Sequence, residues 1–349
     1  MKKITEEELR EILEQHELWL DSDGKEGKCA DLSGADLSGA DLTGANLTGV
    51  NLYGVNLYGV DLSDADLSDA NLTDAILTGA DLTSVDLFAA NLTGANLTNA
   101  NLTDAILYGV NLTRANLTGA NLTRSNLTDA NLTRANLTGA DLTDVYLTSA
   151  YLYRVDLTGA NLTGANLTSA NLYGANLRCA NLTSADLRCA NLYSANLTSA
   201  NLNFADLTSA NLTDANLTGA NLTDADLIGA NLNFADLTDT ILDEKEQCRK
   251  GIVLTEPIVG YKKARGGKII TLELPIGAKV FSINNNKRRT NKAKVIDMQG
   301  KTKLSSKYDT SFKYHIGDEI EIADFDERYN VECGEGIHFF LTRDEAENF

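Results

Sequence analysis

One period organises most of this sequence: from Leu32 to Leu242 every fifth residue is leucine, 43 times without a break in phase. The residue two places before each leucine is small, alanine in 34 repeats and valine in seven, and the residue between them is Asn or Asp in all but five repeats. The two remaining places hold mostly Thr, Ser or Tyr, and then Gly, Asp, Ser, Asn or Arg. A self-similar period constrains a fold more than any other sequence signal, so it is interpreted first.

A period of five excludes an ordinary helix and an ordinary strand. Five residues of α-helix turn about 500°, so the leucines would step roughly 140° around the axis and form no apolar stripe. A plain strand requires alternation, which this spacing breaks in every repeat. The pattern instead predicts a short extended segment, whose small residue and leucine point to the same side, followed by a two-residue turn. Repeated turns of one hand wind the chain into stacked coils with leucine inside.

The rarer residues indicate how many repeats close a coil. Several of them lie twenty residues apart, namely Arg114, Arg134 and Arg154, then Tyr153, Tyr173 and Tyr193, and also Phe88 and Tyr108. Four repeats per coil would stack each set on one face. In that register the inward positions include Leu32, Leu137 and Leu242, together with Val50, Val55 and Val60 on three successive sides of one coil.

Residues 30–243 resemble the pentapeptide-repeat family, whose motif A(D/N)LXX is matched by runs such as ADLTG at residues 40–44. The resemblance covers about three-fifths of the chain and implies a right-handed quadrilateral parallel β-helix. The repeats would make nearly eleven coils, or a rod of about 50 Å at about 4.8 Å per coil.

Residues 1–29 are predicted to form a helical cap on the rod. Thr5 and Glu8 have the spacing of a capping box, and Leu9, Ile12 and His16 recur at helical spacing. A solenoid end exposes its core, so a cap is expected there; a helix that docks a partner is the alternative. The segment holds no apolar leader and nothing long enough to span a membrane, so we expect a cytoplasmic protein without membrane association.

Residues 244–349 are predicted to form a small α+β domain, because the period stops and bulky apolar residues return. Strands are expected at residues 269–274 after a turn at Gly266, at 294–298, within 315–322 around a turn at Gly317 and Asp318, and at 336–341, with a terminal helix after Thr342. The segments 306–312 and 333–340 resemble a domain of uncharacterised function that follows pentapeptide repeats in bacterial and phage proteins. That resemblance implies an architecture and no activity.

Candidates for chemistry are few and scattered. Cys333, His338, His315 and Asp309 show neither metal-ligand spacing nor a nucleophile elbow, so we expect no enzyme, no metal and no cofactor. Cys179 and Cys189 lie half a coil apart and should face opposite ways, which excludes a disulfide between them. The basic residues Lys287, Arg288, Arg289, Lys292 and Lys294 are interpreted as a solvated loop, and we expect no direct binding of nucleic acid; contact with nucleic acid, or with the acidic last coils of the rod, is the alternative.

Charge is unevenly distributed along the repeats. Residues 30–90 hold ten aspartates and no basic residue, residues 91–190 hold six aspartates and six arginines, and residues 191–243 hold seven aspartates and no basic residue. Some pentapeptide-repeat proteins resemble DNA in size and charge and bind type II topoisomerases. They usually vary Leu with Phe at the central position and end in a short dimerising segment, whereas this chain keeps leucine, adds a domain and has a neutral centre. A scaffold for protein–protein interaction is therefore the preferred function, and an acidic DNA mimic that binds a topoisomerase or another DNA-binding protein is the alternative.

The neutral centre is also the predicted partner site. Arginine and aromatic side chains are enriched at binding hot spots, and the columns of Arg114, Arg134, Arg154, Tyr153, Tyr173 and Tyr193 should share one face. Phe88, Tyr108, Ile106 and Tyr146 should share the preceding face. The alternative is that the tyrosines stack and the arginines project into solvent, which would only stiffen the rod.

Overall fold

The computed structural model describes residues 1–241, 252–253, 257–264, 266–276, 278–282, 288–305, 313–321, 337–340 and 342–348. The chain divides into two compact units, Met1–Ile241 and Leu242–Phe349. None of the helices in the described ranges has the length and apolar character needed to cross a membrane.

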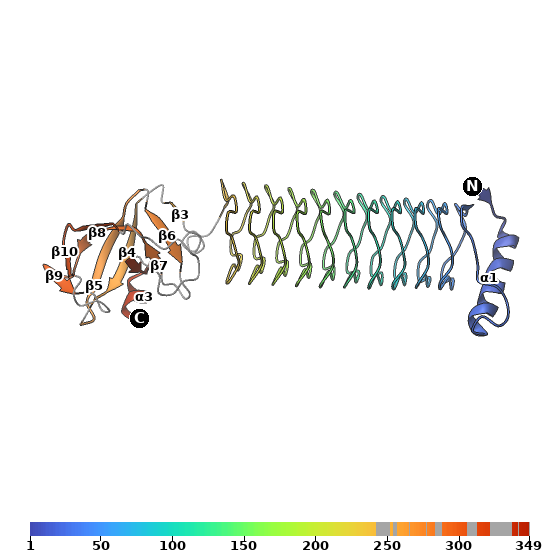
Figure 1. The fold of residues 1–349 in the computed structure, drawn as a ribbon, viewed down its shortest axis with the longest axis horizontal. Helices are drawn as coiled ribbons and strands as arrows, with labels where there is room; N and C mark the ends of the chain where they lie inside the picture. The colour runs from blue at the N-terminus through green and yellow to red at the C-terminus, as the bar shows by residue number, and fades with distance from the viewer. Residues whose placement is uncertain are drawn as a thin grey trace. The chain divides into compact units, whose positions relative to one another are not determined.

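The repeats of the first unit form a β-helix (Figure 1). Parallel bridges join positions twenty residues apart along the whole stack, for example Asn111 to Asn131 and Asn131 to Tyr151. Twenty residues are four repeats, so each coil has four short strands and four turns. The spacing inferred from the rarer side chains is therefore the spacing of the coils.

Every backbone N–H of a typical repeat has an acceptor, as residues 135–139 show. The N–H groups of Asn136, Leu137 and Gly139 donate to carbonyls of the neighbouring coils, Ala115, Asp156 and Thr158, at 2.9, 2.7 and 3.0 Å. Ala135 donates across the preceding turn to Leu132. The fifth N–H, that of Thr138, donates to the side-chain Oδ1 of Asn136 at 3.0 Å. The Asn or Asp of the motif thus completes the pairing that buried or half-buried backbone requires.

The last residue of each repeat lies in the left-handed region. Gly139 has φ +64° and Arg134 has φ +58°, and the turn is closed by the N–H of Ala140, which donates to the carbonyl of Leu137 at 3.0 Å. A left-handed third residue is what a type II turn requires, and glycine adopts it without steric cost. Non-glycine residues also occupy this position in many repeats, so the neighbouring coils impose the conformation.

The core of the rod consists of the leucines and the small residues before them. Leu137 is fully buried and Leu32 is 1% exposed; Leu242 lies outside the described residues. Val50, Val55 and Val60 are buried as predicted. Ser125 replaces the usual alanine, and its hydroxyl donates to the carbonyl of Leu122 at 2.7 Å.

A helix lies against the first coil at the N-terminal end of the stack (Figure 1). Helix α1 (Glu6–Asp21) begins at the predicted capping box, in which Thr5 and Glu8 exchange hydrogen bonds. Strand β1 (Lys2–Lys3) pairs in parallel with β2 (Ala35–Asp36). His16 of helix α1 is buried, and its Nδ1 accepts the N–H of Ala30 at 3.3 Å.

The second unit contains short strands and one described helix. The strands are β3 (Ile252–Val253), β4 (Ile258–Lys263), β5 (Ile269–Leu274), β6 (Lys279–Ser282), β7 (Arg288–Thr290), β8 (Lys292–Asp297), β9 (Lys303–Ser305), β10 (Lys313–His315), β11 (Glu319–Glu321) and β12 (Ile337–Phe339). Two four-stranded sheets have the orders β11-β8-β5-β4 and β12-β7-β6-β3, and β9 pairs with β10. Helix α3 (Arg343–Asn348) follows the predicted cap of Thr342 and Glu345.

A separate apolar core supports these sheets. Leu272, Val295 and Phe339 are fully buried within it. The predicted hairpin is present, since β4 and β5 pair in antiparallel fashion on either side of the turn at Gly266.

Of two predictions about this unit, one was confirmed and one was wrong. The turn expected at Gly317 and Asp318 is present between β10 and β11, and in it Asp318 Oδ2 accepts the N–H of His315. The basic cluster does not form a loop where it is described. Lys292 and Lys294 lie in β8 and form ion pairs with Glu321 and Glu319, at 2.8 and 3.4 Å, because β8 pairs with β11.

Candidate functional site

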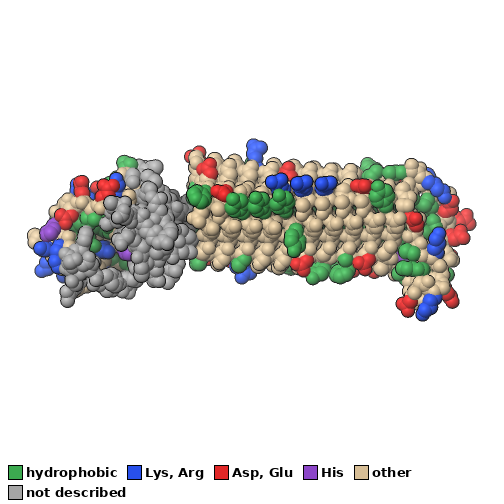
Figure 2. Space-filling view, in the orientation of Figure 1, with side chains coloured by type: hydrophobic (Ala, Val, Ile, Leu, Met, Phe, Trp, Pro, Cys, Tyr) green, Lys and Arg blue, Asp and Glu red, His purple; other side chains and the backbone are tan. Residues whose placement is uncertain are grey.

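Three arginines form a column on one face of the rod, here called the basic column. Arg114, Arg134 and Arg154 occupy the same place in three successive coils, because Arg114 N–H donates to Thr133 and Arg134 N–H donates to Tyr153. All three side chains are exposed. Within the described part of the chain none of the three forms an ion pair. Figure 2 shows a row of cationic side chains beside a row of hydrophobic ones on the face turned to the viewer.

Three tyrosines form a second column beside it, here called the tyrosine column. The rings of Tyr153 and Tyr173 stack at 5.4 Å between centroids, and those of Tyr173 and Tyr193 stack at 5.2 Å. The guanidinium carbon of Arg154 lies 5.2 Å from the centroid of Tyr153, which joins the two columns through a cation–π contact. A hydrogen bond to Asp214 raises the pKa of Tyr193, so that phenol stays neutral.

The preceding face carries apolar side chains in neighbouring coils. Phe88 and Tyr108 stack at 5.8 Å with nearly parallel rings. Ile106 and Tyr146 lie on the same line of bridges, two coils apart, and are 44% and 52% exposed. A hydrogen bond to Asp129 raises the pKa of Tyr108. These residues and the two columns together are called the belt.

In three repeats at the centre of the rod, Ile or Tyr replaces the Asn or Asp whose side-chain oxygen accepts a backbone N–H. Ile106, Tyr146 and Tyr151 stand where most repeats have Asn or Asp; Ile has no oxygen, and the Tyr oxygen lies at the far end of the ring, away from the N–H two residues further on. Tyr151 is 56% exposed and lies in the same repeat as Tyr153 and Arg154. Three of the five departures from the Asn/Asp rule therefore exchange a local hydrogen bond for an exposed apolar side chain in the centre of the rod.

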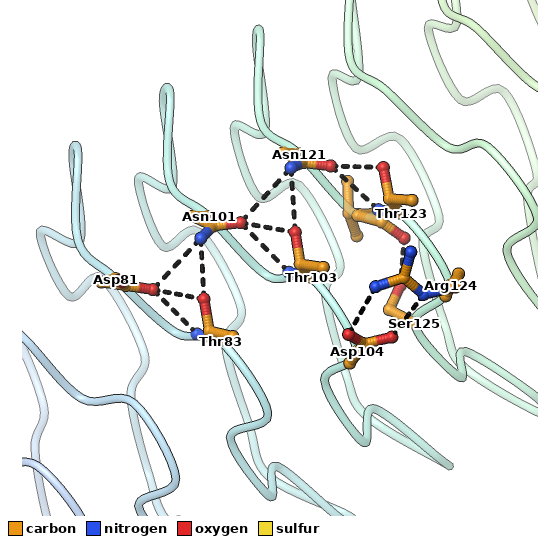
Figure 3. Close-up of polar contacts among 10 residues, drawn as sticks. Asp81, Thr83, Asn101, Thr103, Asp104, Asn121, Thr123, Arg124 and Ser125 are labelled. Carbon is orange, nitrogen blue, oxygen red and sulfur yellow. Dashed lines mark hydrogen bonds and ion pairs between the residues drawn. The ribbon is translucent and has the colours of Figure 1, made fainter.

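Two other arginines of the rod pair with aspartates. Arg124 donates from Nε and Nη2 to the two oxygens of Asp104, at 2.8 and 2.7 Å, beside the Asn and Thr side chains that link successive coils (Figure 3). Arg188 pairs with Asp186 and lies 3.7 Å from Asp206. The Arg124 contact lowers the pKa of Asp104. Arg178 forms no ion pair with a described residue, but it stands alone on its face, whereas the basic column stacks three such arginines.

The columns were predicted from sequence, but two features were missed. Tyr151 was noted only as an exception to the motif, although its place beside Tyr153 could have assigned it to the belt. The pairing of Arg124 with Asp104 could have been found from their spacing of twenty. The burial of His16 was expected, because it lies on the helical stripe of Leu9 and Ile12.

The four residues considered for catalysis or metal binding form no common site in the described part of the chain. Cys333 and Asp309 lie outside the described residues. His338 is in β12 and His315 is in β10, where its Nδ1 lies 3.2 Å from Asp318 Oδ2. No cluster of three or more His, Cys, Asp or Glu suited to a metal ion occurs in the ranges that the structure covers. Cys29, Cys179 and Cys189 are free thiols.

Stacked coils with an outward-facing belt define a solenoid of five-residue repeats. Residues 28–243 match the family "Pentapeptide repeats (8 copies)" in six consecutive, partly overlapping segments, and the chain belongs to the pentapeptide-repeat family. Residues 244–346 match a family of unknown function, DUF5758. No curated protein matches the chain.

Solved structures of the same family resemble the repeat region. HetL, a pentapeptide repeat protein involved in heterocyst differentiation regulation from the cyanobacterium Nostoc sp., is 38% identical over 62% of this chain and 90% of its own, with a TM-score of 0.24. A pentapeptide repeat protein from the thylakoid lumen of Arabidopsis thaliana is 33% identical over 34% of this chain and 82% of its own, with a TM-score of 0.26. QnrB1, a plasmid-mediated fluoroquinolone resistance protein, is 21% identical over 63% and 94%, with a TM-score of 0.27.

Proposed function

We propose that this protein is a non-enzymatic, rigid scaffold that docks a protein partner on the belt of its β-helix. The observation that carries the proposal is the combination of exposed aromatic residues and unpaired arginines on adjoining faces, in the section where charge is balanced. Aromatic and arginine side chains supply most hot spots of protein interfaces. An apolar side chain that replaces a hydrogen-bonded Asn also weakens the rod locally, and such departures from the folding pattern are typical of functional sites.

The experiment compares two variants that leave the core untouched. Tagged protein would be used to capture partners from a lysate of the source organism. The belt variant carries Arg134→Ala, Tyr153→Ala and Tyr173→Ala; the acidic-end variant carries Asp31→Asn, Asp36→Asn and Asp41→Asn. Asn is the commonest residue at the latter position, so the second variant keeps the local hydrogen bond. Loss of the captured protein only in the belt variant supports the proposal; loss only in the acidic-end variant refutes it.

A second candidate function is that of an acidic DNA mimic that binds a type II topoisomerase or another DNA-binding protein. It is favoured by the ten aspartates of residues 30–90, which occupy about three coils, or roughly 15 Å. Duplex DNA carries about one charge per 1.7 Å, a similar density. Inhibition of gyrase supercoiling at stoichiometric protein, abolished by the acidic-end variant, would establish this function. The same aspartates also keep the rod soluble, which requires no partner.

The domain organisation that we propose is a helical cap (1–29), a right-handed β-helix of nearly eleven coils (30–243) and a C-terminal domain (244–349). The helix and the first coil share the hydrogen bond between His16 and Ala30, as a capping element would. The odd number of cysteines in the chain favours a cytoplasmic location. We assign no activity to the C-terminal domain.

A further inference from the structure

The basic column concentrates positive charge without compensation. Its three guanidinium groups recur once per coil, and like charges at that spacing repel one another. Arg124 and Arg188, on other faces, have bidentate carboxylate partners. In the described chain the column has no such partner. An anion that bridges neighbouring guanidinium groups would remove the repulsion, and carboxylates match the planar arrangement of the guanidinium donors.

The length of the column limits the size of the anion. Two steps of about 4.8 Å separate the first and last arginine backbones. The same position holds Asp74 two coils before Arg114 and Asp214 three coils after Arg154. A polyanion such as duplex DNA would extend beyond the column onto the acidic ends and be repelled. A few acidic residues of a protein partner would not.

The tyrosine column forms an apolar surface beside the basic column. Arg154 is held against the ring of Tyr153, and a side chain at Gly174 would contact Arg154 Cγ, so the arginine stem extends over that glycine. Tyr173 and Tyr193 continue the apolar surface along the axis. A segment that follows the rod would therefore meet guanidinium groups first and aromatic rings next.

We propose that the basic column binds a short acidic segment of the protein partner, aligned with the rod axis, with its carboxylates between successive guanidinium groups and its adjoining apolar residues on the tyrosine column. This proposal rests on the function proposed above and specifies the chemistry of the partner. The segment needs only three to five residues to cover the column, at about 3.3 Å per residue.

The test measures binding of labelled hexaglutamate to the full-length protein by fluorescence anisotropy at low ionic strength. Hexalysine and a 20-nucleotide single-stranded poly(dT) serve as comparators. We expect binding of hexaglutamate alone, weakened as salt is added. A variant with Arg114→Gln, Arg134→Gln and Arg154→Gln should lose at least tenfold in affinity. Arg178→Gln is the matched control, because Arg178 is also exposed and forms no ion pair with a described residue, but lies on another face.

Each outcome decides one proposal. Equal affinity of the triple variant and Arg178→Gln, or tighter binding of poly(dT) than of hexaglutamate, overturns the acidic-segment proposal. If hexaglutamate fails to bind while the belt variant still loses its captured protein, the scaffold function is supported and an acidic segment is ruled out as the ligand of the basic column. If hexaglutamate binds the column but capture does not depend on the belt, docking of the partner on the belt is ruled out. Thermal unfolding of each variant verifies that the outward substitutions leave the rod folded.

Discussion

At the scale of single residues, the five positions of the repeat have separate duties. Leucine and alanine fill the axis, and Asn or Asp accepts the N–H that no neighbouring coil can reach, as Asn136 does for Thr138. The last two positions face outward. Substitutions at neighbouring positions should therefore differ greatly in effect.

We expect Leu137→Asp to prevent folding of the central coils. Leu137 is fully buried, and an aspartate there would be an unpaired charge in an apolar interior, which costs several kcal/mol. Thr138→Asp, the matched outward change, should alter stability by less than about 0.5 kcal/mol. Thermal unfolding followed by circular dichroism separates the two, and equal melting temperatures would contradict the inward and outward assignment.

Restoring the motif inside the belt should stabilise the rod and weaken docking. Tyr146→Asn places an acceptor where Thr148 N–H can reach it, in line with Asn126 and Asn166. One hydrogen bond contributes about 0.5–1.5 kcal/mol, so the melting temperature should rise. Capture of the partner should fall, because an exposed aromatic residue is lost. Tyr58→Thr, which removes an exposed tyrosine outside the belt, should leave capture unchanged; the prediction fails if both variants behave alike.

At the scale of elements, helix α1 depends on a histidine that must stay neutral. His16 Nδ1 accepts the N–H of Ala30, which a protonated ring cannot do. Burial lowers the pKa of His16 below 6.5, and the nearby Thr48 backbone opposes this in part. The undocked helix therefore takes up a proton more readily than the docked one. The contact of helix α1 with the first coil should be fully stable above pH 6.5 and weaken as the pH falls below it.

Trp19 is the only tryptophan and stacks on His16 at 5.8 Å, so its fluorescence reports on this helix. We expect the emission and the midpoint of its thermal transition to change between pH 7.5 and pH 5. His16→Gln retains an acceptor and cannot be protonated, so its transition should be independent of pH over that range. A change of the same size in His16→Gln would show that another group is responsible.

In the C-terminal unit, β4 and β12 approach so closely that one position admits no side chain. A Cβ at Gly260 would overlap the buried ring of Phe339. Gly260→Ala should therefore destabilise this unit by about 1–3 kcal/mol. Val259→Ala, at an exposed neighbour, should have a small effect. Hydrogen exchange of residues 257–274 measures both, and equal exchange rates would contradict the close approach.

The elements of the rod and of the tail were predictable to different degrees. The coil of four repeats could be derived because each bridge repeats the same spacing and the Arg and Tyr columns mark it. The turn between β10 and β11 could be derived as well, but the partners of these two strands, β9 and β8, could not. Such pairing depends on residues far along the chain. The columns of the belt were predicted, whereas the ion pair of Arg124 was missed although its spacing of twenty from Asp104 stacks the two residues in neighbouring coils.

At the scale of the whole molecule, the phase of the repeats decides which side chains share a face. Deleting residues 140–144 removes one repeat between Arg134 and Arg154 and turns everything that follows by one face. We expect the protein to fold but to move Arg154 out of the basic column, which then keeps only Arg114 and Arg134, so the affinity for hexaglutamate should fall. Deleting residues 60–64, a repeat of nearly the same sequence before the belt, keeps the column and should keep the affinity.

Circular dichroism and thermal unfolding should give similar results for the two deletions, since each leaves the five-residue period intact. Equal loss of affinity in both would mean that binding does not require the arginines to lie on one face. Retention of affinity in both would have the same meaning.

The left-handed residue that ends each repeat has a consequence for the history of such a chain. Glycine, arginine and phenylalanine adopt it with nearly the same backbone angle, +64° at Gly139, +58° at Arg134 and +58° at Phe204. Mutation can therefore rewrite this position many times while the axis of the rod stays unchanged. Selection for a new partner and selection for a stable fold act on different positions of the same repeat. Binding specificity can therefore diverge quickly in a lineage whose architecture is conserved.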